Sequence, residues 1–475
     1  MIKINELDNV AVVLEKSGII AHGHKVALND IKKGEKVIKY GFPIGTATVN
    51  IKAGEHVHTQ NLISAVSSEN EYNYTPELAG NPTKRAGSFL GYPREDGRVG
   101  IRNEIWIINT VGCVNKAAEK IALTANELYK DKTDGIFAVT HPYGCSQLGV
   151  DHENTQKILA GIARHPNAAG VLILGLGCEN NTICDFKKQL ENYNPKRVRF
   201  LTAQSCEDEV AEGVKLIGEI AETIKSDKRE IIKLDKLIIG LKCGGSDAFS
   251  GITANPLAGR ISDRIISYGG TAVLTETPEM FGAETILMNR CENENIFNKT
   301  VSIINNFKRY FTSHGQEVYE NPSPGNKDGG ITTLEEKSLG CVQKGGAGII
   351  TDVLNYGGRV VKSGLNLLDG PGNDIVSTTA MTAAGCHLIL FTTGRGTPLG
   401  ALAPTIKIST NSDLAIRKSN WTDYDAGKLL SGTGAEKAEN ELWDLIIAVA
   451  EGRTRTRSEV NGYREFAIFK NGVTL

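Results

Sequence analysis

The sequence predicts an α/β protein in which a small β-rich module precedes doubly wound, mostly parallel α/β domains. Three observations support this. Short apolar runs end abruptly in glycine-rich polar loops, as buried strands do. Gly-Cys pairs follow three of these runs and place cysteines at 113, 145 and 178, which are 32 and 33 residues apart. The stretches between them have helical periodicity, and strand–helix–strand units span about 30 residues.

The chain divides into four parts by composition. We expect a β-rich module over 1–67, a polar linker over 68–90, a first α/β domain over 91–230 and a second α/β domain over 231–475. Within the module, alternating residues predict a strand over Ala47–Ile51.

Composition excludes several classes of protein. The net charge of −2 predicts no attraction to nucleic acid or to an anionic membrane. Nine cysteines without CxxC spacing argue against a disulfide framework and for a reducing compartment. The first residues form no apolar signal segment, and no apolar run approaches the roughly 18 residues of a membrane span. We therefore expect a cytoplasmic protein.

Four of the nine histidines lie in the N-terminal module, in two HxH pairs: His22 with His24, and His56 with His58. Residues i and i+2 of a strand share one face, so each pair can present two imidazoles to one metal ion. Surface histidines in loops are the open alternative.

The stretch from Leu241 to Gly259 is the densest in chemistry. A buried strand ends in Lys242, and the following loop carries Cys243, Ser246 and Asp247 among glycines. Ligands of open α/β sheets bind at the carboxyl ends of strands, which makes this loop a candidate binding site. A simple turn with a Ser or Asp N-cap is the alternative.

Other strand ends carry acids and arginines. Three acids follow a predicted strand: Glu276, Glu279 and Glu284. They could bind a metal or act as a general base. The alternative is that they stabilise a helix N-terminus through the helix macrodipole. Arg395 stands alone among small residues at another strand end, as an anion contact would. Three arginines of the loop at 91–104 can clamp a carboxylate, or pair locally with Asp96; they are Arg94, Arg98 and Arg102.

Cys113, Cys145 and Cys178 share one predicted sheet edge. Three thiolates can hold an iron–sulfur cluster with an open iron. We favour the alternative that they are small buried residues at crowded strand ends.

Several catalytic motifs are missing from the sequence. It has no Walker A motif, no GxGxxG that opens a helix with an acid downstream, no GxSxG and no HExxH. The polar strand ends suit proton abstraction next to a carboxylate, with a metal that stabilises the developing charge.

The whole chain resembles the altronate/galactarate dehydratase family of sugar-acid dehydratases. The matching phrases run from end to end: GHK at 23–25, GYPREDGRVGIRNE, TVGCVN, YGCSQLG, LGLGCENN, KCGGSDAFSGITANP, ETPEMFGAE, NPSPGNK, TTLEEKSLGC, PGND, TGRGTP and PTIKISTNS. The resemblance implies an N-terminal β-clip module of the antifreeze-like (SAF) type and a bound divalent metal, Fe²⁺ or Mn²⁺. It implies a hydro-lyase that converts D-altronate to 2-dehydro-3-deoxy-D-gluconate.

Three alternatives stay open: another hydroxy-acid dehydratase or lyase of the family, such as one for galactarate; an iron–sulfur hydro-lyase; and a non-catalytic sugar-acid-binding protein. The expected partner is a small sugar acid, and an assembly of identical subunits is allowed.

The resemblance and the residues together assign hypothetical roles. His24, with His56 or His58, binds metal or protonates the leaving hydroxyl. His22 is the weaker candidate, because altronate-type members of the family carry only the later histidine of this pair. Lys242, Glu276 or Glu279 acts as base. The expected substrate contacts are Arg102 and Arg395 for the carboxylate, and Asn180, Ser246, Asp247 and Asn255 for hydroxyls.

Overall fold

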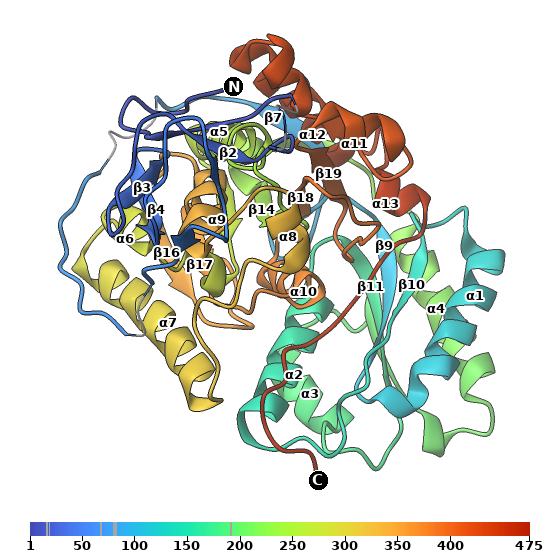
Figure 1. Ribbon diagram of the computed structural model, residues 1–475. Helices are drawn as coiled ribbons and strands as arrows, with labels where there is room; N and C mark the ends of the chain where they lie inside the picture. The colour runs from blue at the N-terminus through green and yellow to red at the C-terminus, as the bar shows by residue number, and fades with distance from the viewer. Residues whose placement is uncertain (16–17, 19, 67–68, 79–82, 191) are drawn as a thin grey trace.

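The computed structural model describes the whole chain except residues 16–17, 19, 67–68, 79–82 and 191. Figure 1 shows the N-terminal module, in blue, packed over the second α/β domain. The first α/β domain, in cyan to green, lies beside it, and the last segment of the chain runs back across to that domain. The two predicted α/β units therefore share one body with the module.

The N-terminal module consists of two antiparallel three-stranded sheets. The first has the order β1 (Val10–Val12), β2 (Lys25–Ala27), β5 (His56–Val57), and the second has the order β3 (Lys36–Lys39), β4 (Phe42–Ala47), β6 (Leu62–Ile63). Many buried side chains of this module, Val37 and Ile44 among them, belong to the same apolar core as those of the second α/β domain, while Ala11, Val13, Ile20 and Val26 form a small cluster of their own. The module is thus anchored on that domain by its own core.

The predicted strand at Ala47–Ile51 is wrong. The strand of this region is β4, which ends at Ala47, and the chain bends at Thr48 and Val49. Val49 is half exposed, so it does not supply the buried face that the alternation suggested.

A small antiparallel sheet joins the parts of the chain, with the order β13 (Glu230–Lys233), β7 (Ser88–Pro93), β8 (Val99–Gly100). The predicted boundaries at 90/91 and 230/231 fall inside β7 and β13. The division into domains stays a prediction. Strands β7 and β13 each span a predicted boundary, so this sheet is shared between the predicted linker and the two α/β domains.

The first α/β domain contains a parallel sheet of four strands in the order β10 (Ile136–Val139), β9 (Glu104–Asn109), β11 (Ala168–Gly175), β12 (Val198–Thr202). Alternate residues of β9 face opposite sides. Ile105 and Ile107 pack with α1 (Asn115–Tyr129) and α4 (Glu209–Ile224), while Trp106 and Ile108 pack with α2 (Gly149–Ala163) and α3 (Ile183–Leu190). Helices on both faces confirm the doubly wound prediction.

The second α/β domain contains a parallel sheet of seven strands. Their order is β16 (Ile350–Leu354), β17 (Gly364–Leu368), β15 (Thr271–Leu274), β14 (Ile238–Cys243), β18 (Leu388–Thr393), β19 (Thr405–Ser409), β20 (Tyr424–Asp425). The chain enters at the central strand β14, continues to β15 on one side and later returns to β18 on the other. The order therefore reverses at β14, and such a switch point is where open α/β sheets bind ligands.

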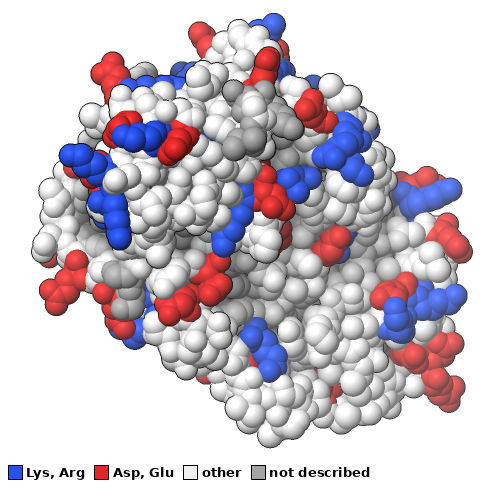
Figure 2. All heavy atoms as spheres, viewed as in Figure 1, with Lys and Arg blue, Asp and Glu red and all other residues white. Residues whose placement is uncertain are grey.

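Nine helices accompany this sheet in the described part of the chain: α5 (Ala254–Ser267), α6 (Glu284–Met288), α7 (Glu294–Ser313), α8 (Pro324–Asp328), α9 (Leu334–Cys341), α10 (Asp374–Ala384), α11 (Ser412–Arg417), α12 (Ala435–Ala450) and α13 (Arg457–Val460). Helix α10 packs on α2 of the first α/β domain in a shared apolar cluster. Among the described residues, no helix is long and apolar enough to cross a bilayer. Basic and acidic side chains are interspersed on the face seen in Figure 2.

Candidate active site

The structure brings His24, His56 and His58 together. Strand β2 pairs with β5 in a register that places Val26 opposite His56, so His24 approaches both later histidines. Their ring centroids lie 5.1 Å (His24–His56), 4.9 Å (His24–His58) and 5.6 Å (His56–His58) apart. Nδ1 of His24 and Nε2 of His56 are 2.9 Å apart and share a hydrogen bond. The ring of His22 packs against that of Phe249, with centroids 4.6 Å apart and the planes tilted by 39°.

The local environment favours the neutral form of His56 and His58. Burial and the neighbouring His24 and Lys25 lower the pKa of His56. Burial, Lys25 and His24 lower the pKa of His58 to about 4. A neutral imidazole has a lone pair for a metal ion, and imidazole is a common ligand of iron. The ring nitrogens of the three histidines do not all lie within 4.8 Å of one another.

The three histidines sit directly against the second α/β domain. Nε2 of His24 lies 3.3 Å from the carbonyl of Asp328, and Nδ1 of His58 lies 2.8 Å from Oγ1 of Thr332. Gly23 makes this approach possible: its φ is +84°, and a Cβ there would lie 3.3 Å from the Phe249 ring. The module therefore places His24 and His58 against the segment that joins α8 to α9, and Gly23 against the loop that follows β14.

A buried carboxylate fixes this docking. Nζ of Lys25 donates to Glu336 at 2.7 Å and to Thr332 at 2.7 Å, and Nζ of Lys39 donates to the other oxygen of Glu336 at 2.8 Å. All three charged side chains are buried. Two ammonium groups of the module thus bracket one carboxylate of α9.

Lys242 is held as a cation at the end of β14. Its buried ammonium donates to Glu276 at 2.7 Å and to Asp374 at 2.6 Å, and also to the carbonyl of Cys243. Burial alone would lower the pKa of Lys242, but the carboxylates of Glu276 and Asp374 raise it well above its ordinary value. The hypothesis that Lys242 is the base therefore loses support, because an amine this strongly paired keeps its proton.

Glu276 and Glu279 have opposite pKa shifts. Burial and the nearby charge of Glu279 raise the pKa of Glu276 well above its usual range. Burial would also raise that of Glu279, but Lys337, Lys242 and Lys344 hold it well below that range. Pairs pushed apart in this way are typical of acid–base sites. Glu276 also has a φ of 71°, a strained value that only three non-glycine residues adopt in the described part of the chain.

Cys243, Glu279 and Cys341 form a group that could hold a metal ion, with ligand atoms all within 4.8 Å of one another. Sγ of Cys243 lies 3.4 Å from Sγ of Cys341 and 3.1 Å from Glu279. Two ammonium groups already bind this group: Lys344 donates to Cys243 at 2.8 Å, and Lys337 pairs with Glu279 at 2.8 Å. The two ammonium groups therefore already neutralise the negative charge that a metal ion would otherwise neutralise.

Ser246, Asp247 and Asn255, in or just after the loop that follows β14, are predicted from the sequence to contact substrate hydroxyls. Of the three, Ser246 has a polar group, its buried Oγ, without a hydrogen-bond partner among the described residues. Asp247, by contrast, accepts bonds from Thr410, Asn411 and the backbone of Phe249. Asn255 is used between Thr392 and the carbonyl of Gly340. Asp247 and Asn255 shape the loop, so we no longer assign them to substrate hydroxyls.

Arg395 lies beside this loop. Its backbone N–H and that of Gly394 donate to the carbonyl of Gly245, and a Cβ at Gly245 would lie 3.4 Å from the Arg395 Cβ. The side chain is exposed and has no ion-pair partner among the described residues. It is therefore available to an anionic ligand at the switch point.

Arg102 and Asn180 lie elsewhere. Arg102 is buried, and its guanidinium binds Glu459 and the carbonyls of Ile101 and Val449, so it cannot clamp a substrate carboxylate. Asn180 follows β11 and accepts bonds from Cys145 and Ser146 of the first α/β domain.

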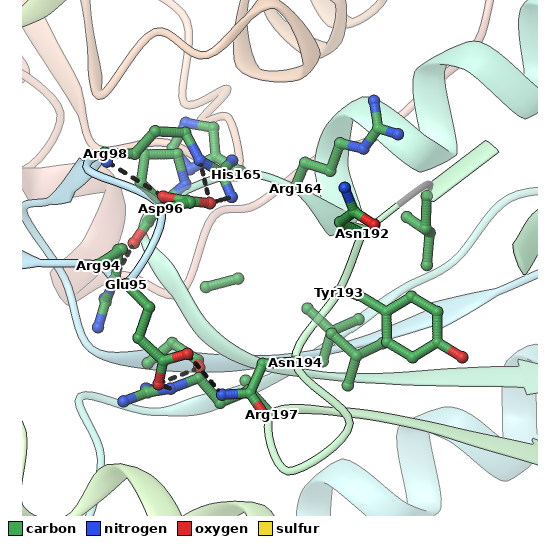
Figure 3. Close-up of a pocket in the computed structure, with 18 residues that line it drawn as sticks. Arg94, Glu95, Asp96, Arg98, Arg164, His165, Asn192, Tyr193, Asn194 and Arg197 are labelled. Atoms are coloured by element: carbon green, nitrogen blue, oxygen red, sulfur yellow. Dashed lines mark hydrogen bonds and ion pairs between the residues drawn. The ribbon is translucent and has the colours of Figure 1, made fainter.

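A cavity of about 440 Å³ lies in the first α/β domain, and Figure 3 shows the residues that line it. Its arginines are already paired: Arg98 with Asp96, and Arg197 with Asp227 and Glu95. Arg94 also binds Asp227, at 2.9 Å. These ion pairs favour the alternative of local pairing over a carboxylate clamp for the arginine-rich loop.

The interpretation of Cys113, Cys145 and Cys178 as buried packing residues is also wrong. All three are exposed, whereas Cys243, Cys291, Cys341 and Cys386 are buried. They do share one edge of the parallel sheet, as the spacing predicted, because β10, β9 and β11 are neighbours.

Sequence reasoning missed four charged residues of the site. Each of them contacts a buried charged group or thiol described above: Asp374 binds Lys242, Glu336 binds Lys25, Lys337 binds Glu279 and Lys344 binds Cys243. Of the four, Asp374 in the PGND turn follows a strand. The other three lie on or just after α9, where their spacing resembles that of an ordinary helix.

Fold and site together define a class: an α/β protein with an N-terminal SAF-type module whose histidines contact the segment between α8 and α9, and with a charged switch point at the end of β14. Three family models cover the chain: the altronate/galactarate dehydratase SAF domain over residues 14–65, the D-galactarate dehydratase/altronate hydrolase second domain over 91–225, and the D-galactarate/altronate dehydratase C-terminal domain over 234–474. The chain belongs to the altronate/galactarate dehydratase family.

Relatives cover its full length. The chain is 50% identical to an altronate dehydratase of Escherichia coli and 51% identical to one of Bacillus subtilis, over 100% of this chain and 99% of each relative. It is 32% identical to a galactarate dehydratase (L-threo-forming) of Escherichia coli, over 98% of this chain and 96% of that relative.

Proposed function

We propose that this protein is a hydro-lyase that dehydrates D-altronate to 2-dehydro-3-deoxy-D-gluconate in the cytoplasm. The single observation that carries the proposal is the identity of about one half, over the entire chain, with two altronate dehydratases. A galactarate dehydratase is much less similar, at 32%. The charged switch point supplies groups for the chemistry, as follows.

The reaction removes a proton from C2 and hydroxide from C3, and the resulting enol tautomerises to the 2-keto acid. A C–H bond next to a carboxylate is very weakly acidic, so the charge that develops on that carboxylate needs a stabilising cation. In our proposal Arg395 binds the substrate carboxylate, because its exposed guanidinium has no competing partner among the described residues.

We assign the C2 proton to Glu276. Its raised pKa makes its ionised carboxylate a stronger base than an ordinary glutamate, and the ammonium of Lys242, 2.7 Å away, both favours that ionised form and orients it. Asp374 shares that ammonium and has a partly exposed side chain, so it marks the side from which substrate approaches. Ser246, whose buried Oγ is unpaired, is the proposed contact to a substrate hydroxyl.

The divalent metal is assigned to His24, His56 and His58. The three imidazoles lie next to one another, but their ring nitrogens do not all come within 4.8 Å of one another. An imidazole-bound Fe²⁺ or Mn²⁺ therefore requires the rings to move closer and the hydrogen bond between His24 and His56 to give way. A bound metal would supply Lewis-acid polarisation of a substrate oxygen. The histidines themselves are positioned for this by their contacts with Asp328 and Thr332.

A panel assay of 2-keto acid release tests the proposal. Chain reconstituted with Fe²⁺ or Mn²⁺ under anaerobic conditions is offered D-altronate, galactarate and sulfolactate. Turnover of altronate with the highest kcat/KM is the expected result. Faster turnover of galactarate or sulfolactate would show that the substrate is another hydroxy acid used by the family. Tight binding of altronate without product would show that the protein is a sugar-acid-binding protein and not an enzyme for altronate.

A further inference from the structure

We propose that Cys113, Cys145 and Cys178 bind an iron–sulfur cluster through three thiolates. The inference concerns the first α/β domain and does not depend on the substrate proposed above. The cysteines follow β9, β10 and β11, and these strands are neighbours in a parallel sheet. Their carboxyl ends therefore place the thiols along one edge.

The loops that carry the thiols are fixed to one another. The N–H of Gly112 donates to the carbonyl of Tyr143 at 2.8 Å, and the N–H of Asn181 donates to that of Gly144 at 3.0 Å. A Cβ at Gly144 would lie 1.9 Å from the carbonyl oxygen of Thr110, so only glycine permits this contact. The edge is therefore preorganised before any cofactor binds.

The exposure of the thiols is difficult to explain by packing. Free cysteine is among the most buried residue types, and four other cysteines of this chain follow that rule. Cys113, Cys145 and Cys178 depart from it on adjacent loops, and Cys184 on α3 is exposed as well. Thiolates that hold iron, by contrast, must be reachable when the cluster is inserted.

Amide side chains lie near two of the three thiols. Oδ1 of Asn180 lies 3.7 Å from Sγ of Cys145 and accepts from the N–H of Ser146 at 3.3 Å. The amide of Gln204 donates to Sγ of Cys178 at 3.6 Å, and hydrogen bonds to sulfur tune iron–sulfur sites. Ser146 has a φ of 62°, a strained conformation of the kind that gathers at functional sites.

The three thiols do not form a compact site for a single ion. A metal–sulfur distance of 2.3 Å in a tetrahedral site separates two ligand sulfurs by about 3.8 Å. Among the described residues, the group of metal ligands that all lie within 4.8 Å is Cys243, Glu279 and Cys341, and the three exposed thiols do not meet this limit. The proposal of a cluster therefore rests on the shared sheet edge and the linked loops.

The test uses the full chain, reconstituted anaerobically with ferrous iron and sulfide. Iron, acid-labile sulfide, visible absorption and the electron paramagnetic resonance spectrum after reduction are measured. Wild type and Cys184→Ser, a matched exposed thiol on α3, should bind stoichiometric iron and sulfide. Cys113→Ser, Cys145→Ser and Cys178→Ser should each lose most of the sulfide, with melting temperatures that show an intact fold.

Three results would overturn the inference: wild type that binds no labile sulfide, wild type that binds a single zinc ion without sulfide, or serine variants that match Cys184→Ser. His24→Ala should retain the cluster. Absence of altronate turnover in a chain with an intact cluster would count against the proposed substrate and not against this site.

Discussion

The two parallel sheets present opposite kinds of chemistry at their carboxyl edges. At the seven-stranded sheet the functional groups are buried and paired, as for Lys242 between Glu276 and Asp374. At the four-stranded sheet the thiols of Cys113, Cys145 and Cys178 are exposed. The N-terminal module and α9 cover the first edge, and a covered edge has a low local dielectric that makes each charge pair costly to break. The comparison predicts large effects at one edge and small ones at the other.

The largest effect is expected for Glu336→Gln. The change leaves two buried ammonium groups, Lys25 and Lys39, without their carboxylate, and should lower the free energy of unfolding by about 5 kcal/mol. Urea unfolding measures it, and Glu6→Gln, an exposed glutamate of the module, is the control.

The pH dependence of the same variant sharpens this prediction. Burial would raise the pKa of Glu336, but Lys25 and Lys39 lower it to about 2. Because the pKa is lower in the folded state, its contribution is present above the ordinary value of 4.5 and is lost as pH falls through about 2. The difference between wild type and variant should shrink over that window, and a constant difference would contradict the assignment.

The next effect is that of Lys242→Met. It leaves Glu276 buried without its cation and should lower the free energy of unfolding by about 3 kcal/mol. This value is at the low end of what breaking a buried ion pair costs, because the side chain of Asp374 is 36% exposed and partly solvated. Lys236→Met, an exposed lysine just before β14, should unfold like wild type. Equal stability of the two variants would show that the switch point is not held by this ion pair.

Glu276→Gln tests the proposed base. The amide keeps the volume and cannot accept the proton, so kcat should fall by about 100-fold or more while KM changes little. Steady-state assays on altronate measure it, with Glu284→Gln as a second buried glutamate, one that binds Tyr72 and Lys308 instead. Retention of kcat in Glu276→Gln would transfer the base to another residue.

Ser246→Ala separates binding from stability. Its hydroxyl is buried and unpaired, so the free energy of unfolding should stay constant or rise by up to about 1 kcal/mol. The KM for altronate should increase. Ser262→Ala removes an equally unpaired hydroxyl from α5 and should leave KM unchanged, whereas an equal rise in both would refute the contact.

The smallest effect is predicted at the open edge. In the chain without a cluster, Cys145→Ser should change the free energy of unfolding by less than about 0.5 kcal/mol, because the side chain is exposed. Cys386→Ser buries a hydroxyl and should cost about 1–3 kcal/mol. Calorimetry of both variants measures the two changes. A larger loss of stability in Cys145→Ser than in Cys386→Ser would contradict the contrast between exposed and buried cysteines.

Local pattern predicted much of the fold. The strands of the first α/β domain were predictable because each is an apolar run bounded by glycine or polar residues, and their spacing implied parallel pairing. The strand expected at Ala47–Ile51 failed because alternation alone does not show which residues become buried; Val49 is half exposed.

The site was predictable only where local pattern decides it. The HxH spacing anticipated that His56 and His58 share a face, and the strand end anticipated Lys242. The fate of Arg102 depended on Glu459, 357 residues away, and that of Asp247 on Thr410, so no local signal revealed that both are satisfied within the fold. The exposure of the three cysteines likewise depends on what covers a sheet edge.

One measurement tests the central claim most directly: altronate turnover and bound metal in His56→Ala compared with His314→Ala, an exposed histidine at the end of α7. The account predicts that His56→Ala loses both turnover and metal while His314→Ala matches wild type. Full turnover and metal content in His56→Ala would show that the histidines of the module do not form the active site.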